Sequence, residues 1–213
     1  MKPYYQDDAV TIYHGDCRDV LLHLPPVDLV LTDPPYGIGY ITSRRLYTDK
    51  LVAPIQGDEQ YPVAIIQQCK TLAAVGVLAF ARGEPMKAHS MLVWVKNNWS
   101  VGDLEHAYGN RWETILWWPG PFHQWRNGRP ANVLFCDKVP PEQLQHPTEK
   151  PIALLRQLIL QHKCDLILDP FMGSGTTLRA AKDLGRKAIG IEIEERYCEI
   201  AAKRMSQLVM ELT

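Results

Sequence analysis

The stretch that decides the fold is CDLILDPFMGSGTTLRAAKDLGRKAIGIEI, residues 164–193. It divides into a buried strand, a tight glycine loop, a helix and a second strand, over residues 164–170, 171–175, 176–186 and 187–193. A long amphipathic helix is predicted next, over 194–212. This strand–helix–strand–helix order indicates an α/β fold with a mainly parallel sheet.

The N-terminal two thirds of the chain continue the alternation. Strands are predicted over residues 10–16, 27–33, 75–82, 91–96, 113–119 and 131–137. Helices are predicted over residues 17–24, 60–74 and 84–90. A polar loop spans about 40–57, and the Trp-, Asn- and Gly-rich region 97–130 has weak periodicity. We expect one domain over 1–213, with 97–130 as a small insertion or surface loops.

The bulk composition is that of a single globular domain. The chain has 213 residues, 46% hydrophobic and 22% charged, with a net charge of −1. No overall field attracts nucleic acid or a membrane, so polyanion binding would need local basic patches. Five cysteines without a Cys-x-x-Cys pair predict free thiols and no zinc site. The chain lacks a signal core and a long apolar run, which predicts a cytoplasmic protein without a membrane partner.

The glycine loop is the first candidate binding site. In an open parallel sheet, ligands bind beyond the carboxyl ends of the strands. Gly173 and Gly175 permit a sharp turn and close backbone approach, and the next helix directs free N–H groups to the same place. Glu192 follows Asp169 by 23 residues, the usual spacing for an acid that binds ribose hydroxyls. The loop predicts a site for an adenosine-containing ligand, the alternative being a plain turn with structural glycines.

The identity of that ligand follows from what the loop lacks. Thr177 and Leu178 stand where a dinucleotide fingerprint has its third glycine, and no Gly-Lys-Ser/Thr of a P-loop is present. Asp169 precedes the glycines, and a carboxylate suits an ammonium group better than a phosphate. These features favour S-adenosylmethionine.

A second polar strand end is Asp33-Pro34-Pro35-Tyr36. The prolines have fixed φ angles and no N–H, which makes a rigid segment with free carbonyl acceptors. A carboxylate, such carbonyls and an aromatic ring suit a planar base with an exocyclic amino group. A Pro-Pro turn with a solvated Asp and a Tyr packed on the core explains the tetrapeptide equally well.

Five segments together carry a family resemblance. They are TDPPYG (32–37), DPFMGSGTT (169–177), YHGDC (13–17), HPTEKP (146–151) and GIEIEERYCEIAAKRM (190–205). The chain resembles the amino-group DNA methyltransferases, which make N6-methyladenine or N4-methylcytosine. The resemblance covers most of 10–96 and 131–205.

The order of the motifs is similar to the permuted arrangement called the β class, because the Asp-Pro-Pro-Tyr tetrad precedes the glycine loop. It implies a circularly permuted Rossmann-like S-adenosylmethionine-dependent methyltransferase fold. In that fold the strand ending at Asp16 would lie beside the strand ending at Glu192. The strands ending at Asp33 and Asp169 would also be neighbours, so that one crevice receives both cofactor and target base.

The resemblance also implies roles for individual residues. The catalytic tetrad would be Asp33, Pro34, Pro35 and Tyr36. Asp16 and Cys17 would contact the cofactor adenine, and the cofactor-binding set as a whole would be Asp16, Cys17, Asp33, His146, Thr148, Lys150, Asp169, Phe171, Gly173, Ser174, Gly175, Thr176, Thr177 and Glu192. A solvated lysine at a helix start remains the alternative for Lys150, and a structural turn histidine the alternative for His146.

The implied mechanism needs no metal. The target base would be flipped out of the duplex and stacked on Tyr36. Asp33 and the Pro34 carbonyl would hold its amino hydrogens while the nitrogen attacks the methyl group.

Contacts to DNA would come from local basic residues. The candidates are Arg44 and Arg45 in the loop 40–57, Lys96 at a strand end, and Arg126 and Arg129 in the region 97–130. Ordinary surface solvation remains an alternative for them. Compact relatives often dimerise, so the resemblance also implies a homodimer as one possible assembly.

The base to be methylated is the least determined feature. Asp at the first tetrad position is more usual in adenine enzymes and Ser in cytosine enzymes, so we expect methylation of adenine N6. Cytosine N4 remains the nearest alternative. An RNA or protein-amide methyltransferase, and a non-catalytic nucleic-acid-binding module of the same fold, are further alternatives.

Overall fold

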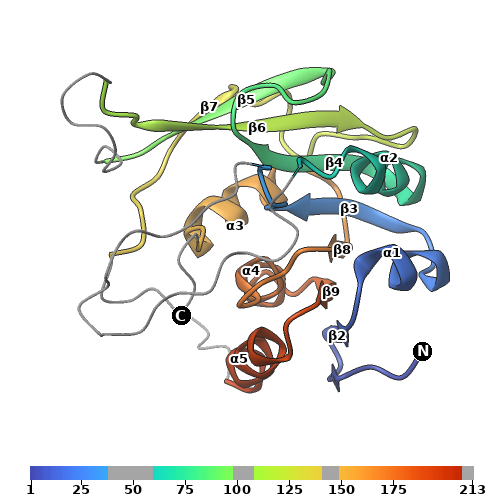
Figure 1. The fold of residues 1–213 in the computed structure, drawn as a ribbon. Coiled ribbons are helices and arrows are strands. Elements are labelled where there is room, and N and C mark those ends of the chain that lie inside the picture. The colour runs from blue at the N-terminus through green and yellow to red at the C-terminus, as the bar shows by residue number, and fades with distance from the viewer. Residues whose placement is uncertain (38–59, 98–107, 141–148, 208–213) are drawn as a thin grey trace.

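The computed structural model describes residues 1–37, 60–97, 108–140 and 149–207 of the chain (Figure 1). Within them, one sheet has the strand order β1-β2-β9-β8-β3-β4-β6-β5-β7. The strands are β1 (Tyr5–Gln6), β2 (Val10–His14), β3 (Val27–Thr32), β4 (Ala73–Ala81), β5 (Ser90–Val95), β6 (Trp112–Pro119), β7 (Val133–Phe135), β8 (Leu166–Asp169) and β9 (Lys187–Glu192). The helices are α1 (Cys17–Val20), the 3₁₀ helix η1 (Leu21–His23), α2 (Val63–Leu72), α3 (Ile152–Leu160), α4 (Thr176–Asp183) and α5 (Glu195–Ser206).

The sheet is mainly parallel, as predicted. Strands β2, β9, β8, β3 and β4 pair in parallel, and β5 pairs in parallel with β7. Strand β6 is antiparallel to both β4 and β5. Strands β4 and β5 therefore run in the same direction, and their carboxyl ends lie on the same edge of the sheet as those of β3 and β8. This edge is called the carboxyl edge below.

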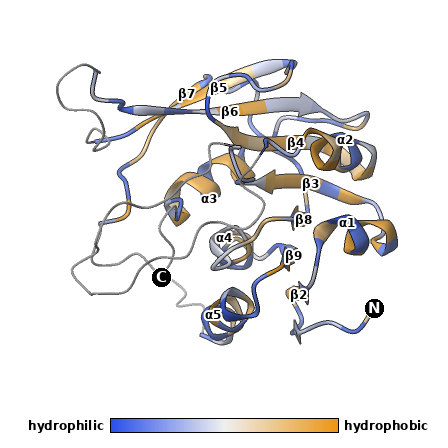
Figure 2. Ribbon diagram, in the orientation of Figure 1, coloured by the Kyte–Doolittle hydropathy of each residue, from blue (hydrophilic) through white to orange (hydrophobic). Residues whose placement is uncertain are grey.

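Helices cover both faces of the sheet, which makes a three-layer α/β structure (Figure 1). Helices α3, α4 and α5 pack on one face, and α1, η1 and α2 pack on the other. Successive residues of β3 serve the two cores in turn: Leu29 and Leu31 face α3–α5, and Val30 faces α1 and α2. Strands buried on both faces need nearly continuous apolar sequence, and Figure 2 shows β3 and β4 in mostly hydrophobic colours.

The C-terminal strands β8 and β9 lie between the N-terminal strands β2 and β3. His14, which lies two residues before Asp16, pairs with Glu192, so the strand ends at Asp16 and Glu192 are neighbours. Val30 pairs with Leu168, which brings the strand ends at Asp33 and Asp169 together. Both expected neighbour relations are confirmed. The assignment to the permuted class remains an interpretation.

The helix predicted over 84–90 is wrong. Gly83 has a φ of +75°, and Pro85 follows it, so this segment is a loop. The Trp118 indole donates a hydrogen bond to the Lys87 carbonyl at 2.9 Å and holds the loop across the sheet. The loop carries the chain past the position of β6, because β6 lies between β4 and β5.

The predicted strand 113–119 corresponds to β6 in the middle of this half of the sheet. Part of the region 97–130 is thus buried sheet and not surface loop. Residues 98–107 of that region lie outside the described residues.

All five cysteines are free, and four of them are buried. In the portion of the chain that the structure describes, none of the helices has the length and apolar character needed to cross a membrane.

A cluster of aromatic and imidazole rings closes the sheet edge opposite the carboxyl edge. The His162 ring lies 4.7 Å from the Trp117 ring and 5.1 Å from the Trp125 ring, centroid to centroid. Its two nitrogens are buried with no hydrogen-bond partner among the described residues. Burial, with a smaller contribution from the nearby His123, lowers the pKa of His162 to about 3.

This cluster predicts an acid-sensitive fold. The unfolded chain takes up a proton at His162 near pH 6.5, whereas the folded chain resists it down to about pH 3, so stability is lost as pH falls through that range. At pH 5 the loss from this one residue is about 2 kcal/mol. We expect His162→Phe to remove this component in urea titrations at pH 7 and pH 5. The exposed His23→Phe is the control, and equal acid sensitivity of wild type and His162→Phe would contradict the prediction.

Candidate functional site

The ends of β3 and β8 are joined by a buried carboxylate. The Thr32 hydroxyl donates to Asp169 Oδ1 at 2.7 Å, and the Phe171 amide donates to the same oxygen at 3.1 Å. Burial raises the pKa of Asp169 to about 6, although the Thr177 and Thr32 hydroxyls oppose the shift. Asp169 therefore ties the two strand ends together and sets the direction in which the glycine loop leaves β8.

The glycine loop has the left-handed backbone that its sequence predicts. Gly173 has a φ of +50°, and Gly175 has a φ of +80° as the N-cap of α4. A Cβ on Gly175 would lie 2.8 Å from the Ala201 Cβ in α5, so a side chain there would also displace that helix. The glycine at 175 is required both by its conformation and by this close approach.

Glu192 is held against the same loop from the end of β9. Its Oε2 accepts from the Gly173 amide at 3.0 Å, and its Oε1 accepts from the Glu194 amide at 2.8 Å. Burial raises the pKa of Glu192. Ser174, Thr176 and Thr177, which follow Gly173, are all buried. The predicted loop residues and the predicted acid thus form one connected cradle.

Asp16 lies at the neighbouring strand end, after β2. Its side chain caps α1 by accepting from the Arg18 amide at 2.8 Å. The Arg18 guanidinium also binds this carboxylate and lowers its pKa. Burial raises the pKa of the adjacent Cys17 thiol to about 12, so this cysteine is not a nucleophile. Asp16 and Glu192 therefore present two acidic groups on adjacent strands, β2 and β9.

Asp33 and Tyr36 form a compact unit with Lys150. The Tyr36 hydroxyl donates to Asp33 Oδ1 at 2.7 Å, and Lys150 Nζ lies 2.5 Å from Asp33 Oδ2 and 3.2 Å from the Tyr36 oxygen. Burial raises the pKa of Asp33, and burial together with Asp33 raises that of Tyr36. Burial alone would lower the pKa of Lys150, but the carboxylates of Asp33 and Glu113 outweigh it and raise that pKa. Lys150 is therefore a charged partner of the tetrad and not a solvated lysine.

Sequence reasoning missed Glu113, on β6. Its Oε1 lies 2.5 Å from Lys96 Nζ, and its Oε2 lies 3.4 Å from Lys150 Nζ. Burial would raise its pKa, but the charges of Lys150 and Lys96 lower it on balance. The one available signal was a single carboxylate in the apolar strand sequence WETILWW, residues 112–118.

A second buried ion pair was also missed. Arg204 on α5 contacts Glu149 Oε1 at 2.8 Å and the Thr176 hydroxyl at 2.9 Å. Glu149 directly precedes Lys150, so this pair anchors the segment that carries the lysine to α5 and to the start of α4. The pair therefore connects the start of α4, at the glycine loop, to the tetrad through the adjacent Lys150.

Two of the residues expected to contact DNA, Lys96 and Arg126, have surroundings that do not favour such a contact. Lys96 is only 5% exposed, and its ammonium is paired with Glu113 and lies 5.2 Å from the Trp94 ring centre. This burial argues against a phosphate contact. Arg126 binds the Gln161 and His162 carbonyls on the edge opposite Asp33, and Arg129 is exposed. The remaining predicted residues, Arg44, Arg45, His146 and Thr148, lie outside the described residues.

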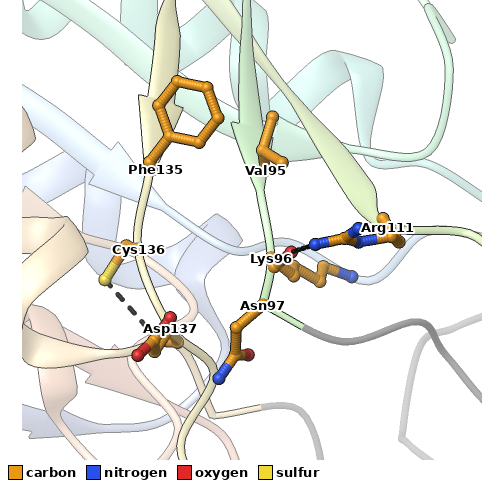
Figure 3. A pocket seen from close by; sticks show the side chains of 7 residues that line it. All are labelled: Val95, Lys96, Asn97, Arg111, Phe135, Cys136 and Asp137. Atoms are coloured by element: carbon orange, nitrogen blue, oxygen red, sulfur yellow. Dashed lines mark hydrogen bonds between the residues drawn. The ribbon is translucent and has the colours of Figure 1, made fainter.

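A cavity of ≈ 400 Å³ opens on the carboxyl edge, beside the ends of β5 and β7 (Figure 3). The Arg111 guanidinium donates to the Lys96 carbonyl there at 3.2 Å. The Phe135 side chain, 73% exposed, and the Trp112 side chain, 48% exposed, lie at the same end of the sheet. The cavity is lined by Val95, Lys96, Asn97, Arg111, Phe135, Cys136 and Asp137. Nowhere in the described ranges do three or more His, Cys, Asp or Glu side chains gather as a metal site would require.

Comparison with known proteins finds relatives along nearly the whole chain. A sequence profile of the N6/N4 DNA methylase family matches residues 118–203. The putative methylase YubD of Escherichia coli K12 is 31% identical, over 90% of this chain and 88% of that protein. The type II methyltransferase M2.DpnII of Streptococcus pneumoniae is 27% identical, over 96% of this chain and 92% of that protein.

Solved structures share the fold. The crystal structure of M1.HpyAVI matches with a TM-score of 0.65 and 27% identity, over 93% of this chain and 100% of that one. The cytosine-N4-specific PvuII DNA methyltransferase matches with a TM-score of 0.72 and 18% identity, over 100% of this chain and 91% of that one.

The Glu149–Arg204 pair predicts a large effect on stability. Glu149→Ala leaves Arg204 buried without its carboxylate, and breaking such a pair costs about 3 kcal/mol or more. The control is Glu199→Ala, which removes an exposed i,i+4 pair with Lys203 worth about 0.5 kcal/mol. Urea unfolding of the two variants measures the difference, and equal losses would show that the buried pair is not an anchor.

Proposed function

This chain belongs to the N6/N4 DNA methylase family, and from that premise we propose that it transfers a methyl group from S-adenosylmethionine to the N6 amino group of adenine in DNA. The observation that carries the proposal is the adjacency of two strand ends. One bears the half-buried Asp33–Tyr36 unit, and the other bears the glycine cradle. A methyl donor and an acceptor must meet within a few ångströms, and neighbouring strand ends provide that distance.

The residues of the cradle suit S-adenosylmethionine. Gly173 and Gly175 permit close backbone approach, and the N-terminus of α4 opens beside them. Glu192 would accept hydrogen bonds from the ribose hydroxyls, and Asp16 would accept one from the adenine amino group. When bound, S-adenosylmethionine supplies an activated methyl group. The site is lined by carboxylates, and its glycine loop lacks the lysine of a P-loop, so it suits this ligand better than a nucleotide with its phosphates.

Asp33, Pro34 and Tyr36 would bind and orient the base that accepts the methyl group. The Asp33 carboxylate retains lone pairs for an amino hydrogen, and the carbonyl of Pro34 supplies a second acceptor. Tyr36 is fixed by its hydrogen bond to Asp33, so its ring offers a rigid stacking surface. Lys150 opposes the protonation of Asp33 by pairing with it. Because the tetrad cannot reach a base inside a duplex, the base is flipped out.

Adenine is proposed because Asp stands at the first tetrad position, and a relative named DNA adenine methyltransferase YhdJ, from Escherichia coli K12, is 28% identical over 94% of this chain. Cytosine N4 is the second candidate, favoured by the shared fold with the PvuII enzyme. Liquid chromatography–mass spectrometry of nucleosides from treated DNA separates the two. N6-methyldeoxyadenosine is the expected product, and N4-methyldeoxycytidine would reverse the assignment.

The duplex would dock on the carboxyl edge around the cavity of Figure 3. Arg111 offers a cation there, and Trp112 and Phe135 offer exposed aromatic faces. In this proposal the exposed groups of this surface take the place of Arg126, on the opposite edge, and of Lys96, which lines the cavity but has its ammonium paired with Glu113. Arg44, Arg45 and Arg129 are kept as contacts predicted from the sequence. A homodimer and a cytoplasmic location stay predictions.

Asp33→Ala should abolish methyl transfer, by about a thousandfold or more, because the amino group loses its charged acceptor. Binding of S-adenosylmethionine, measured by calorimetry, should stay within a few fold of wild type. Transfer of labelled methyl groups to DNA measures the rate, and circular dichroism checks the fold. Near-normal methylation by the folded variant would refute the role of Asp33.

Arg111→Ala should weaken DNA binding and reduce the slope of log K against log salt by about 1, the effect of losing one phosphate contact. Arg126→Ala is the matched control, since Arg126 lies on the opposite edge of the sheet. Fluorescence anisotropy at several salt concentrations measures both variants. If Arg126→Ala had the larger effect, the proposed docking surface would be wrong.

A further inference from the structure

Four charges alternate in sign across the carboxyl edge, from two buried lysines and two half-buried carboxylates. Lys96 from the end of β5 contacts Glu113 on β6 at 2.5 Å, Glu113 contacts Lys150 at 3.4 Å, and Lys150 contacts Asp33 at 2.5 Å. We call these four residues the charged row. The row ends at the carboxylate that the proposed function makes catalytic, so an inference about it rests on that function.

Lys150 is the central link of the row and is only 7% exposed. Its ammonium group lies within hydrogen-bond distance of Asp33 and of the Tyr36 oxygen, and it forms an ion pair with Glu113 Oε2 at 3.4 Å. The ammonium also lies 5.0 Å from the Phe80 ring centre. Its position against Asp33 is therefore set from several sides, and among the described residues Glu113 supplies a negative charge from outside the tetrad.

A structural role alone does not account for Glu113. Buried ion pairs add little net stability, because desolvation offsets their attraction, and apolar residues of similar volume serve as well or better. The neighbours of Glu113 on the same face of β6, Ile115 and Trp117, are apolar core residues. A carboxylate among these apolar side chains of β6 is explained by the ammonium group of Lys150 that it contacts.

We propose that Glu113 is a positioning residue, which holds Lys150 against Asp33 and with Lys96 sets the charge around the catalytic carboxylate. Glu113 does not touch the target base. It acts through Lys150, whose ammonium group it contacts from β6, whereas Asp33 and Tyr36 contact that group from the end of β3.

Positioning by Glu113 has an effect of definite sign on Asp33. The groups facing Asp33 are Lys150, Tyr36 and Glu113, with Asp169 from β8 and Tyr61 at longer range. Glu113 acts on Asp33 in two ways of opposite sign: its own charge disfavours ionisation of Asp33, and its hold on Lys150 favours ionisation. Positioning by Glu113 therefore predicts that Glu113→Gln raises the pKa of Asp33 because Lys150 is released, whereas like-charge repulsion alone predicts that the substitution lowers it. Lys96→Gln leaves both Glu113 and Lys150 in place, so it should change the pKa of Asp33 less than Glu113→Gln does.

The experiment is a titration of the ligand-free protein by ¹³C NMR, with carboxyl-labelled aspartate and the Asp33 signal assigned from Asp33→Asn. Wild type, Glu113→Gln, Lys96→Gln and the double variant are compared, with Glu199→Gln on the exposed face of α5 as the matched carboxylate control. In parallel, kcat and KM for DNA methylation are measured from pH 5 to pH 9. If Glu113→Gln does not fold, the double variant, which removes both members of the Lys96–Glu113 pair, carries the test.

The expected result is a raised pKa of Asp33 in Glu113→Gln and in the double variant, with a smaller change in Lys96→Gln and the wild-type value in Glu199→Gln. The acid limb of kcat should move with the Asp33 pKa, and Glu113→Gln should lower kcat about tenfold with KM changed less than twofold. A lowered pKa of Asp33 in Glu113→Gln, or no shift in that variant, would overturn the inference. If the variants show these NMR shifts but the wild-type protein methylates no DNA, the proposed function is refuted and the positioning role of Glu113 is not.

Discussion

The parallel pairing of β3 with β8 is the constraint on which the rest of the site depends. It brings Thr32 to within 2.7 Å of Asp169, although 137 residues separate them in the chain. The hydrogen bond closes the seam between the two strand ends, and the tetrad and the glycine loop leave the sheet side by side. Without this pairing the chain would carry both motifs but would have no common site for donor and acceptor.

Electrostatics then determines how the two halves of the site differ. The cradle side carries carboxylates held by backbone amides, as Glu192 is by Gly173 and Glu194. The tetrad side carries a carboxylate held by a buried ammonium group, Lys150. Both kinds of donor oppose protonation of the carboxylate, but only the ammonium partner adds a full positive charge beside it.

Lys96 and Arg126, two of the predicted DNA contacts, have surroundings that the sequence did not indicate. Lys96 stands at a strand end, and its partner Glu113 is brought to it only by the insertion of β6 between β4 and β5. The loop of Arg126 turns back to the end of α3 on the opposite edge of the sheet. Both are long-range contacts, which local composition does not report.

The sequence by itself determined the α/β class and the two motifs at the strand ends, and the adjacency of those ends followed from the family resemblance. The class and the motifs are encoded in contiguous segments, where strand periodicity, proline geometry and glycine conformation act within a few residues. Only the tertiary structure decided which charges are paired. Glu113, Lys150 and Arg204 acquire their roles from partners on other strands and helices, and the strength of a buried charge pair depends on distance and desolvation, which only the folded chain defines.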